Sequence, residues 1–271
     1  MNLIKNIITC CSLFLTFNNL IAEEDILILQ STTSTKNSGF IDHIIPIIKK
    51  DTGIILKVVS VGTGQAIKNA MNCDGDVLLT HSKEDEIEFV LSGYGVKRHK
   101  LMYNDYIIIG PSEDPAKIEK VKDLSKALER IKNSKSLFVS RGDNSGTHKK
   151  EIRLWRLAGI DPQLHSGDWY LELGSGQGSM INTAVGLGAY ALSDRATWIS
   201  FKNKQDFKIL FEKYTELTNQ YSLILVNIDK CSNVKKELGE VFINWMLSEK
   251  GKYAINNFIM NGYKLFTYNA Q

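Results

Sequence analysis

Short apolar segments alternate with longer amphipathic segments along nearly the whole chain. The apolar segments predict strands at residues 26–30, 54–61, 76–80, 102–110, 136–140, 188–192 and 221–228. The amphipathic segments predict helices at residues 39–50, 65–71, 84–92, 122–132, 147–158, 179–187, 234–247 and 249–259, while residues 206–218 have a mixed pattern. This alternation predicts an α/β protein in which helices cover mostly parallel sheets.

The first 22 residues are expected to lie outside this fold as a signal peptide. Lys5 provides a positive charge, an interrupted apolar stretch follows at residues 7–15, and acidic residues come directly after Ala22. This layout is typical of a secretory signal that is cleaved after Ala22. The apolar stretch is too short for a membrane anchor, and Cys10-Cys11 precede its end, which disfavours a lipid anchor.

Charge and the spacing of cysteine and histidine exclude several functional classes. The 271 residues include 33 Lys and Arg against 30 Asp and Glu, so bulk charge does not favour nucleic-acid binding. The four cysteines form no CxxC motif and the five histidines have no metal-ligand spacing, so no metal site and no cofactor are expected. Cys73 and Cys231 remain in the mature chain, and whether they pair depends on a Cα separation that sequence does not provide.

Four loops rich in Gly, Ser and Thr stand where helices are expected to begin, at residues 31–39, 60–65, 140–147 and 174–179. Free backbone N–H groups and the helix dipole attract anions at such positions, and Gly allows the backbone to approach closely. One such loop is better explained as a helix cap. Four together favour an anion site, because in an open α/β sheet these loops gather at the carboxyl ends of the strands.

No catalytic motif accompanies these loops. The chain lacks GxxxxGK[ST], and the alternating glycines of residues 174–178 do not form GxGxxG. Ser145 and His148 lie three residues apart without a GxSxG elbow, so His148 is expected on a helix surface. We therefore expect a binding protein and not an enzyme.

Arg141 is the one arginine in the four loops and can present a bidentate fork to an oxyanion. Asp143 either holds that guanidinium or faces the ligand, where it would repel a full dianion and accept a hydrogen bond from a protonated one. Arg195 either adds a second cation to the site or forms a surface pair with Asp194.

Seven motifs together carry a resemblance to a known family. In order they are STTSTKNSG, VGTGQA, DVLLTHS, GYGVKRHKLMYNDYIIIGP, SRGDNSGTHKKE, WYLELGSGQGSM and GAYALSDRATW. With this series the chain resembles the substrate-binding proteins of tungstate ABC transporters (Tup type), and more widely the phosphate- and molybdate-binding periplasmic proteins. The resemblance extends over residues 26–263.

The resemblance implies a bilobal type II periplasmic-binding-protein fold, in which two α/β lobes are joined by two hinge crossings. These crossings would lie near residues 104–108 and 221–224. Lobe one would comprise residues 23–106 and 223–271, and lobe two residues 107–222.

The resemblance also implies which residues hold the ligand. They are Thr32, Thr33, Ser34 and Thr63 from lobe one, and Arg141, Ser145, Gly146, Thr147, Ser175, Gly176 and Ser179 from lobe two. The chain departs from the family at Gln30-Ser31, where a hydrophobic residue or Thr is usual. It departs again at residues 193–197, which read SDRAT where TDRGT is usual, and this leaves the role of Arg195 open.

The function implied is capture of tungstate in the cleft between the lobes and its delivery to an ABC permease and ATPase. Tungstate and molybdate are fully deprotonated at neutral pH and suit a pocket of donors, whereas phosphate needs an acceptor, for which Asp143 is the candidate. The alternatives are a molybdate- or phosphate-binding transport protein, a secreted enzyme acting on a small anion, and a receptor domain. The expected protein is a periplasmic monomer.

Overall fold

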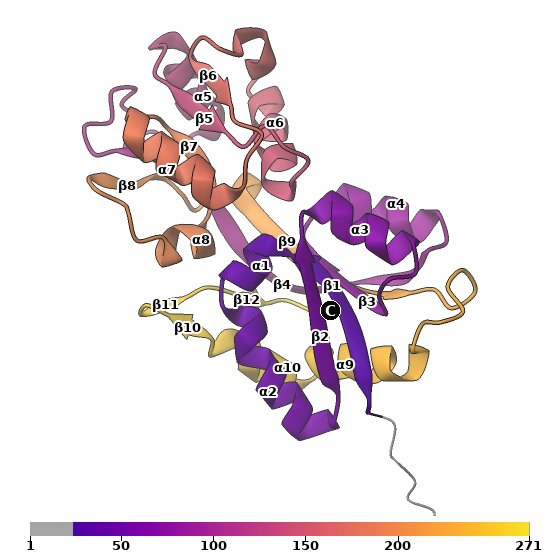
Figure 1. The fold of residues 1–271 in the computed structure, drawn as a ribbon. Helices are drawn as coiled ribbons and strands as arrows, with labels where there is room; N and C mark the ends of the chain where they lie inside the picture. Colours follow the sequence, from indigo (N-terminus) through magenta and orange to yellow (C-terminus); the bar gives the residue numbers. More distant parts are fainter. Residues whose placement is uncertain (1–23, 271) are drawn as a thin grey trace, which may run out of the picture.

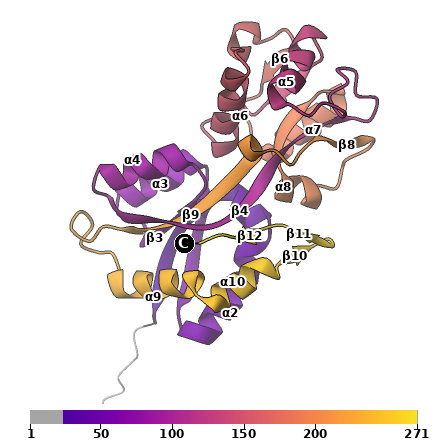
Figure 2. The same ribbon diagram turned by 180° about the vertical axis from the view of Figure 1, so that it is seen from behind.

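The computed structural model describes residues 24–270. The signal peptide expected at residues 1–22 lies outside the described residues. Two α/β lobes lie one above the other in Figure 1, and both ends of the described chain belong to the lower one. Two long strands run from the lower lobe into the upper lobe, as the view from behind also shows (Figure 2).

The described residues contain the seven predicted strands in the predicted order, together with five further strands that were not predicted. They are β1 (Ile26–Thr32), β2 (Ile55–Val61), β3 (Val77–Thr80), β4 (Gly95–Pro111), β5 (Phe138–Ser140), β6 (Tyr170–Glu172), β7 (Ala191–Asp194), β8 (Phe207–Phe211), β9 (Thr218–Val226), β10 (Ile259–Met260), β11 (Tyr263–Lys264) and β12 (Thr267–Tyr268). β4 is much longer than the expected strand because it serves both lobes. The expected strand at residues 188–192 is shifted to β7.

The predicted helices are all present. The helical segments are α1 (Thr33–Asn37), α2 (Phe40–Thr52), α3 (Thr63–Met71), α4 (Lys83–Leu91), α5 (Leu124–Asn133), α6 (Gly146–Leu157), η1 (Pro162–His165), α7 (Gln177–Leu187), α8 (Arg195–Ser200), η2 (Thr215–Leu217), α9 (Lys236–Leu247) and α10 (Glu249–Asn256). The short helices α1 and α8 were not expected, because five or six residues are too few to show a clear helical period.

The sheets are mixed, so the expectation of mostly parallel sheets is wrong. β1 pairs in parallel with β2 and β3, and β5 with β6. The pairs of β3 with β9 and of β4 with β7, β8, β9 and β12 are antiparallel, as is the pair of β10 with β11. β4 and β9 run in opposite directions between the lobes, and opposed neighbours must pair in the antiparallel pattern.

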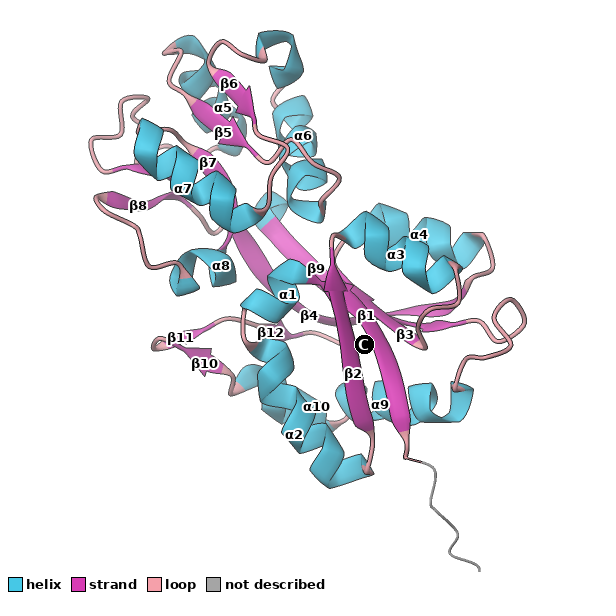
Figure 3. Cartoon of the chain, viewed as in Figure 1, coloured by secondary structure: helices cyan, strands magenta, loops and turns pink. Residues whose placement is uncertain are grey.

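The main sheet has the order β12-β4-β9-β3-β1-β2, with β7 and β8 joined to β4. β4 pairs with β9 from Gly95 to Asp105 and then with β7 and β8 from Tyr106 to Pro111. Helices cover the sheet of each lobe, as the colouring in Figure 3 makes clear. This topology brings the carboxyl ends of β1, β2 and β3 to the edge that faces the second lobe.

The buried hydrophobic side chains form one cluster in the first lobe and two in the second. The first-lobe cluster joins β1–β3 to α2, α9 and α10, and includes Phe40, Leu79 and Phe242. The four tryptophans are all buried. α8 lies between the lobes, since Ile199 packs into the first-lobe cluster and Trp198 into a second-lobe cluster.

Cys73 and Cys231 form a disulfide, with their Cα atoms 5.2 Å apart. The bond joins the turn after α3 to the segment between β9 and α9. It therefore ties the early part of the first lobe to the part that returns from the second. Within residues 24–270, no helix has the length and apolar character needed to cross a membrane.

Candidate functional site

A small polar cavity of about 20 Å³ lies where the two lobes meet. Its lining is Thr32, Thr33, Ser34, Val61, Gly62, Thr63 and His81 from the first lobe, and Arg141, Ser145, Gly146 and Thr147 from the second. Eight of the eleven residues expected at the site are among them. No carboxylate is present in the lining, and Arg141 is its one permanent cation.

Ser175, Gly176 and Ser179 are not brought to this cavity. Gly176 and Ser179 are exposed at the start of α7. The fourth loop instead lies behind Arg141: the Ser175 N–H donates to the Arg141 carbonyl at 3.1 Å, and the Arg141 Nη1 donates to Gln177 Oε1 at 3.4 Å. Its structural connection to the site is therefore through Arg141.

Three helices begin at the cavity. Thr32 caps α1, with its Oγ1 accepting from the Thr35 N–H at 3.3 Å, and Ser145 caps α6 by accepting from the His148 N–H at 3.1 Å. α3 begins after Gly62, which has no side chain to serve as a cap. Backbone N–H groups of the first turns therefore point toward the cavity, where the positive ends of the helix dipoles also converge.

Arg141 is held in place by Asp143, which decides between the two roles open for that carboxylate. Asp143 Oδ2 accepts from Arg141 Nε at 3.2 Å and from Nη2 at 2.5 Å. Its other oxygen accepts from the Ser145 N–H at 3.2 Å. Asp143 does not line the cavity. Both carboxylate oxygens are thus engaged in orienting the loop and its guanidinium.

Arg195 has neither of the roles considered for it. It donates to Asp105 through Nε and Nη2, each at 2.6 Å, and to Glu212 at 2.6 Å. These carboxylates raise the pKa of its guanidinium. Asp194, its expected surface partner, is buried and caps α8 by accepting from the Thr197 N–H at 2.9 Å. Arg195 therefore anchors α8 to the crossing strand β4.

His81 lines the cavity and was missed from sequence. Its Nε2 is hydrogen-bonded to Ser34 Oγ at 3.0 Å and its Nδ1 to the Tyr106 hydroxyl at 3.3 Å. The ring packs on Tyr221 with centroids 4.8 Å apart. Burial lowers the His81 pKa to about 4, so the imidazole is neutral at neutral pH. Its position directly after β3, at the carboxyl edge of the sheet, is the signal that could have identified it.

The segment that carries His81 is fixed by the buried carboxylate of Glu86. Glu86 accepts from Thr80 Oγ1 at 2.9 Å, from the Ser82 N–H at 2.9 Å and from Arg98 Nε at 2.7 Å. Burial raises the Glu86 pKa in spite of these partners. The bonds to Thr80 and Ser82 flank His81 on both sides and so set the position of its backbone.

A second buried carboxylate supports the Arg141 loop from within the other lobe. Glu151 accepts from Ser140 Oγ at 3.0 Å and from the Tyr170 hydroxyl at 2.7 Å, and burial raises its pKa to about 8. Ser140 Oγ is also 3.1 Å from His148 Nδ1. His148 is therefore half-buried and bonded, which corrects its expected place on a helix surface. Ser140 is fully buried, so its bonds to Glu151 and His148 hold the start of the Arg141 loop in place.

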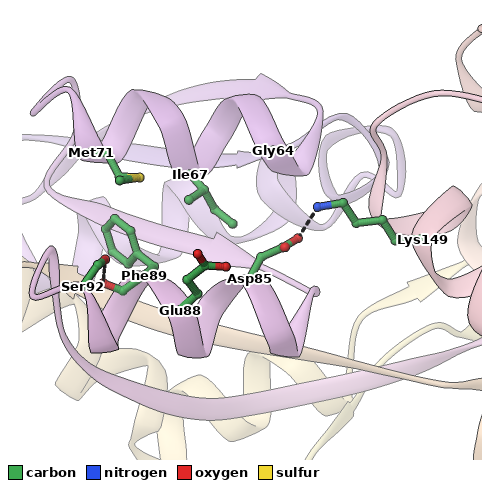
Figure 4. A pocket seen from close by; sticks show the side chains of 8 residues that line it. All are labelled: Gly64, Ile67, Met71, Asp85, Glu88, Phe89, Ser92 and Lys149. Carbon is green, nitrogen blue, oxygen red and sulfur yellow. Dashed lines mark hydrogen bonds and ion pairs between the residues drawn. The ribbon is translucent and has the colours of Figure 1, made fainter.

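The lobes touch each other around the cavity. A Cβ atom at Gly146 would lie 3.1 Å from Thr63 Oγ1 and 3.2 Å from His81 Cε1, so only glycine allows this approach without a shift of its neighbours. Beside the cavity, Lys149 on α6 reaches Asp85 on α4 at 2.7 Å, as seen in the pocket of Figure 4. Among the described residues, no group of three or more His, Cys, Asp or Glu is arranged to hold a metal ion.

The two α/β lobes, the crossing strands and the donor-lined cavity between them define a bilobal substrate-binding protein. In agreement, residues 21–250 match the family model of the PBP superfamily domain. The tungstate-binding protein TupA of Peptoclostridium acidaminophilum is 46% identical over 248 residues, which cover 90% of this chain and 86% of the relative. The chain therefore belongs to the TupA family within the PBP superfamily.

Two further comparisons agree with this placement. The tungstate-binding protein TupA of Campylobacter jejuni is 40% identical, over 88% of this chain and 89% of the relative. The solved structure of the tungstate-binding protein TupA of Desulfovibrio alaskensis G20 is similar with a TM-score of 0.81 and 43% identity, over 91% of this chain and 99% of that one.

Proposed function

We propose that this protein captures tungstate in the cavity between its lobes and delivers it to an ABC transporter. The observation that carries the proposal is the composition of the cavity wall: one arginine, several hydroxyls, three helix N-termini and no carboxylate. A fully ionised tetrahedral dianion needs only donors, and the wall offers only donors or groups that can act as donors. The relatives named as tungstate-binding proteins support the same ligand.

The hydrogen bonds of Asp143 favour a fully deprotonated oxyanion as the ligand and disfavour a protonated phosphate. A protonated phosphate requires an acceptor in its site, and the carboxylate that could have served is bonded to Arg141 and to the Ser145 N–H. Molybdate has nearly the same size and charge as tungstate. The preference for tungstate therefore rests on the relatives and not on the geometry of the cavity.

The binding residues that we propose are the eight expected residues that line the cavity, with His81 added. They are Thr32, Thr33, Ser34, Thr63, His81, Arg141, Ser145, Gly146 and Thr147. For Ser175, Gly176 and Ser179 we propose an indirect role, because their loop supports Arg141 from behind.

We propose the lobe limits as expected, with residues 23–106 and 223–271 in one lobe and 107–222 in the other. The change of partners along β4, from β9 to β7 and β8 at Tyr106, supports the first limit. Closure of the lobes would then bend β4 and β9, and would bring Gly146 against Thr63 and His81 as in this structure.

The proposed setting is the periplasm, where the protein works as a monomer and not as an enzyme. A disulfide between Cys73 and Cys231 suits an oxidising compartment. The proposed partners are the permease and ATPase subunits of the transporter.

Calorimetric titration of the purified protein with tungstate, molybdate, sulfate and phosphate tests this function. We expect tight binding of tungstate, with molybdate as the nearest competitor and little heat from phosphate. Tight phosphate binding without tungstate heat would overturn the proposal. Molybdate binding that is tighter than tungstate binding would reassign the ligand.

A further inference from the structure

A second, larger cavity lies next to the small one, with a volume of about 130 Å³. Its lining includes His81, Gly146, Lys83, Lys149, Lys150 and Arg153. Four of these side chains are cationic and none is a carboxylate. This concentration of one charge contrasts with the whole chain, whose formal net charge is only +3.

The two cavities share part of their walls. His81 and Gly146 line both of them, one from each lobe. Arg141 lines only the small cavity of the two, and Lys150 lines only the larger one. An anion in the larger cavity would therefore lie beside the small one, with His81 and Gly146 in the wall common to both.

The three cations that α6 contributes differ in how far their charge is already balanced. Lys149 pairs with Asp85 at 2.7 Å and Arg153 pairs with Glu84 at 2.5 Å, both carboxylates coming from α4. Lys150 has no carboxylate within ion-pair distance in the described part of the chain. Its Nζ donates to the Thr218 carbonyl at 3.3 Å and lies 5.9 Å from the centre of the Tyr106 ring.

Lys150 is also partly removed from water. Its side chain extends from α6 to Thr218 at the start of β9 and is half-buried. Burial, with the neighbouring Arg153, lowers the Lys150 pKa to about 8, which still leaves most of the side chain charged at neutral pH. Glu84 and Glu216 act on this ammonium only from beyond ion-pair distance. A half-buried ammonium without a directly bonded carboxylate would gain from an anion placed beside it.

We propose that the larger cavity is an outer oxyanion site, where a tetrahedral dianion is held by Lys150 and its neighbours before it enters the small cavity. The proposal rests on the proposed function, since it assumes that the small cavity binds the same anion. A cleft lined by one sign of charge raises the local concentration of an opposite ligand and its association rate, and salt weakens this effect. Local charge can therefore steer a ligand that the nearly neutral chain as a whole cannot.

Stopped-flow measurement of tryptophan fluorescence on mixing with tungstate tests the outer site. We expect Lys150→Met to lower the association rate constant about threefold to tenfold at low ionic strength, with the difference shrinking as salt is added. The dissociation rate constant should change much less, because the inner contacts remain. Methionine keeps the aliphatic stem over Tyr106, and Lys150→Arg should restore the rate by restoring the charge.

Lys126→Met is the matched control, because Lys126 is exposed on α5 and the same charge is removed there. It should leave both rate constants unchanged. Equal association rate constants for Lys150→Met and wild type would overturn the outer site. A change in the dissociation rate constant alone would also overturn it. Wild-type protein that binds no tungstate would instead overturn the proposed function, so the two failures are distinguishable.

Discussion

Asp143 accepts two hydrogen bonds from the Arg141 guanidinium through a single carboxylate oxygen, at 3.2 and 2.5 Å. The remaining guanidinium nitrogen, Nη1, has only a long contact of 3.4 Å to Gln177. This pairing orients the cation at the cavity and at the same time removes the carboxylate from contact with an anion. One ion pair thus sets both the charge and the donor character of the proposed site.

Removal of the guanidinium is expected to weaken tungstate binding strongly. Arg141→Ala should raise the dissociation constant more than about tenfold, because a charge-assisted bond to a desolvated anion is lost. Calorimetry measures this directly. Arg130→Ala, an exposed arginine on α5, is the control and should bind as wild type does. Unchanged affinity in Arg141→Ala would make Arg141 only a structural partner of Asp143.

His81 is expected to contribute to binding as a neutral hydrogen-bonding group. His81→Ala should weaken tungstate binding by about 1–2 kcal/mol, because its bonds to Ser34 and Tyr106 are lost with it. His81→Gln keeps a neutral donor and acceptor and should weaken binding less. Equal affinities of wild type and His81→Ala would show that the imidazole is only a packing residue on Tyr221.

A methyl group at Gly146 is expected to oppose closure of the lobes. The added Cβ would lie 3.1 Å from Thr63 Oγ1 and 3.2 Å from His81 Cε1. Gly146→Ala should therefore weaken tungstate binding by about 1–2 kcal/mol. Gly186→Ala, whose Cβ would meet nothing within 4 Å, is the control. Small-angle scattering with tungstate should show a less compact Gly146→Ala protein, and identical profiles would contradict the prediction.

The buried carboxyl of Glu151 is expected to make stability depend on pH. Its pKa is raised from 4.5 to about 8, so between these values the folded protein binds more protons than the unfolded chain. The free energy of unfolding should then fall as pH rises from about 6.5 to 8, by at most about 1.4 kcal/mol per pH unit, and level off above pH 8. Below about pH 6.5 the lowered pKa of His81 acts in the opposite direction and offsets this fall. Glu151→Gln imitates the neutral acid and should flatten this slope.

Urea titrations at several pH values measure the slope for each protein. Glu88→Gln removes an exposed carboxylate on α4 and should keep the slope of wild type. A slope in Glu151→Gln equal to that of wild type would show that Glu151 does not cause it.

The disulfide is expected to stabilise the protein without taking part in binding. Cys73→Ser with Cys231→Ser should lower the free energy of unfolding by about 2–5 kcal/mol, since the bond closes a loop across 158 positions of sequence. Tungstate affinity should stay the same, because neither cysteine lines the cavity. Denaturant unfolding with and without reductant measures the loss. A reductant effect of equal size in the double variant would point to another cause.

Local sequence patterns predicted most of the helices and strands correctly. The elements and pairings that they missed share physical causes. α1 and α8 are too short to show a hydrophobic period, so no helical pattern marks them in the sequence. The alternation of strands and helices along the chain could not predict that the sheets are mixed. The direction of β9 beside β3 and β4 depends on where the chain crosses between the lobes.

At the site, the sequence alone identified the Gly/Ser/Thr loops and Arg141, because caps, glycines and charge are local properties of the chain. Tertiary structure decided that three loops form the cavity and that the fourth stands behind Arg141. It also decided that Arg195 binds Asp105 and that His81 lines the cavity. These outcomes depend on distances between residues far apart in sequence, and such distances exist only once the lobes are folded and in contact.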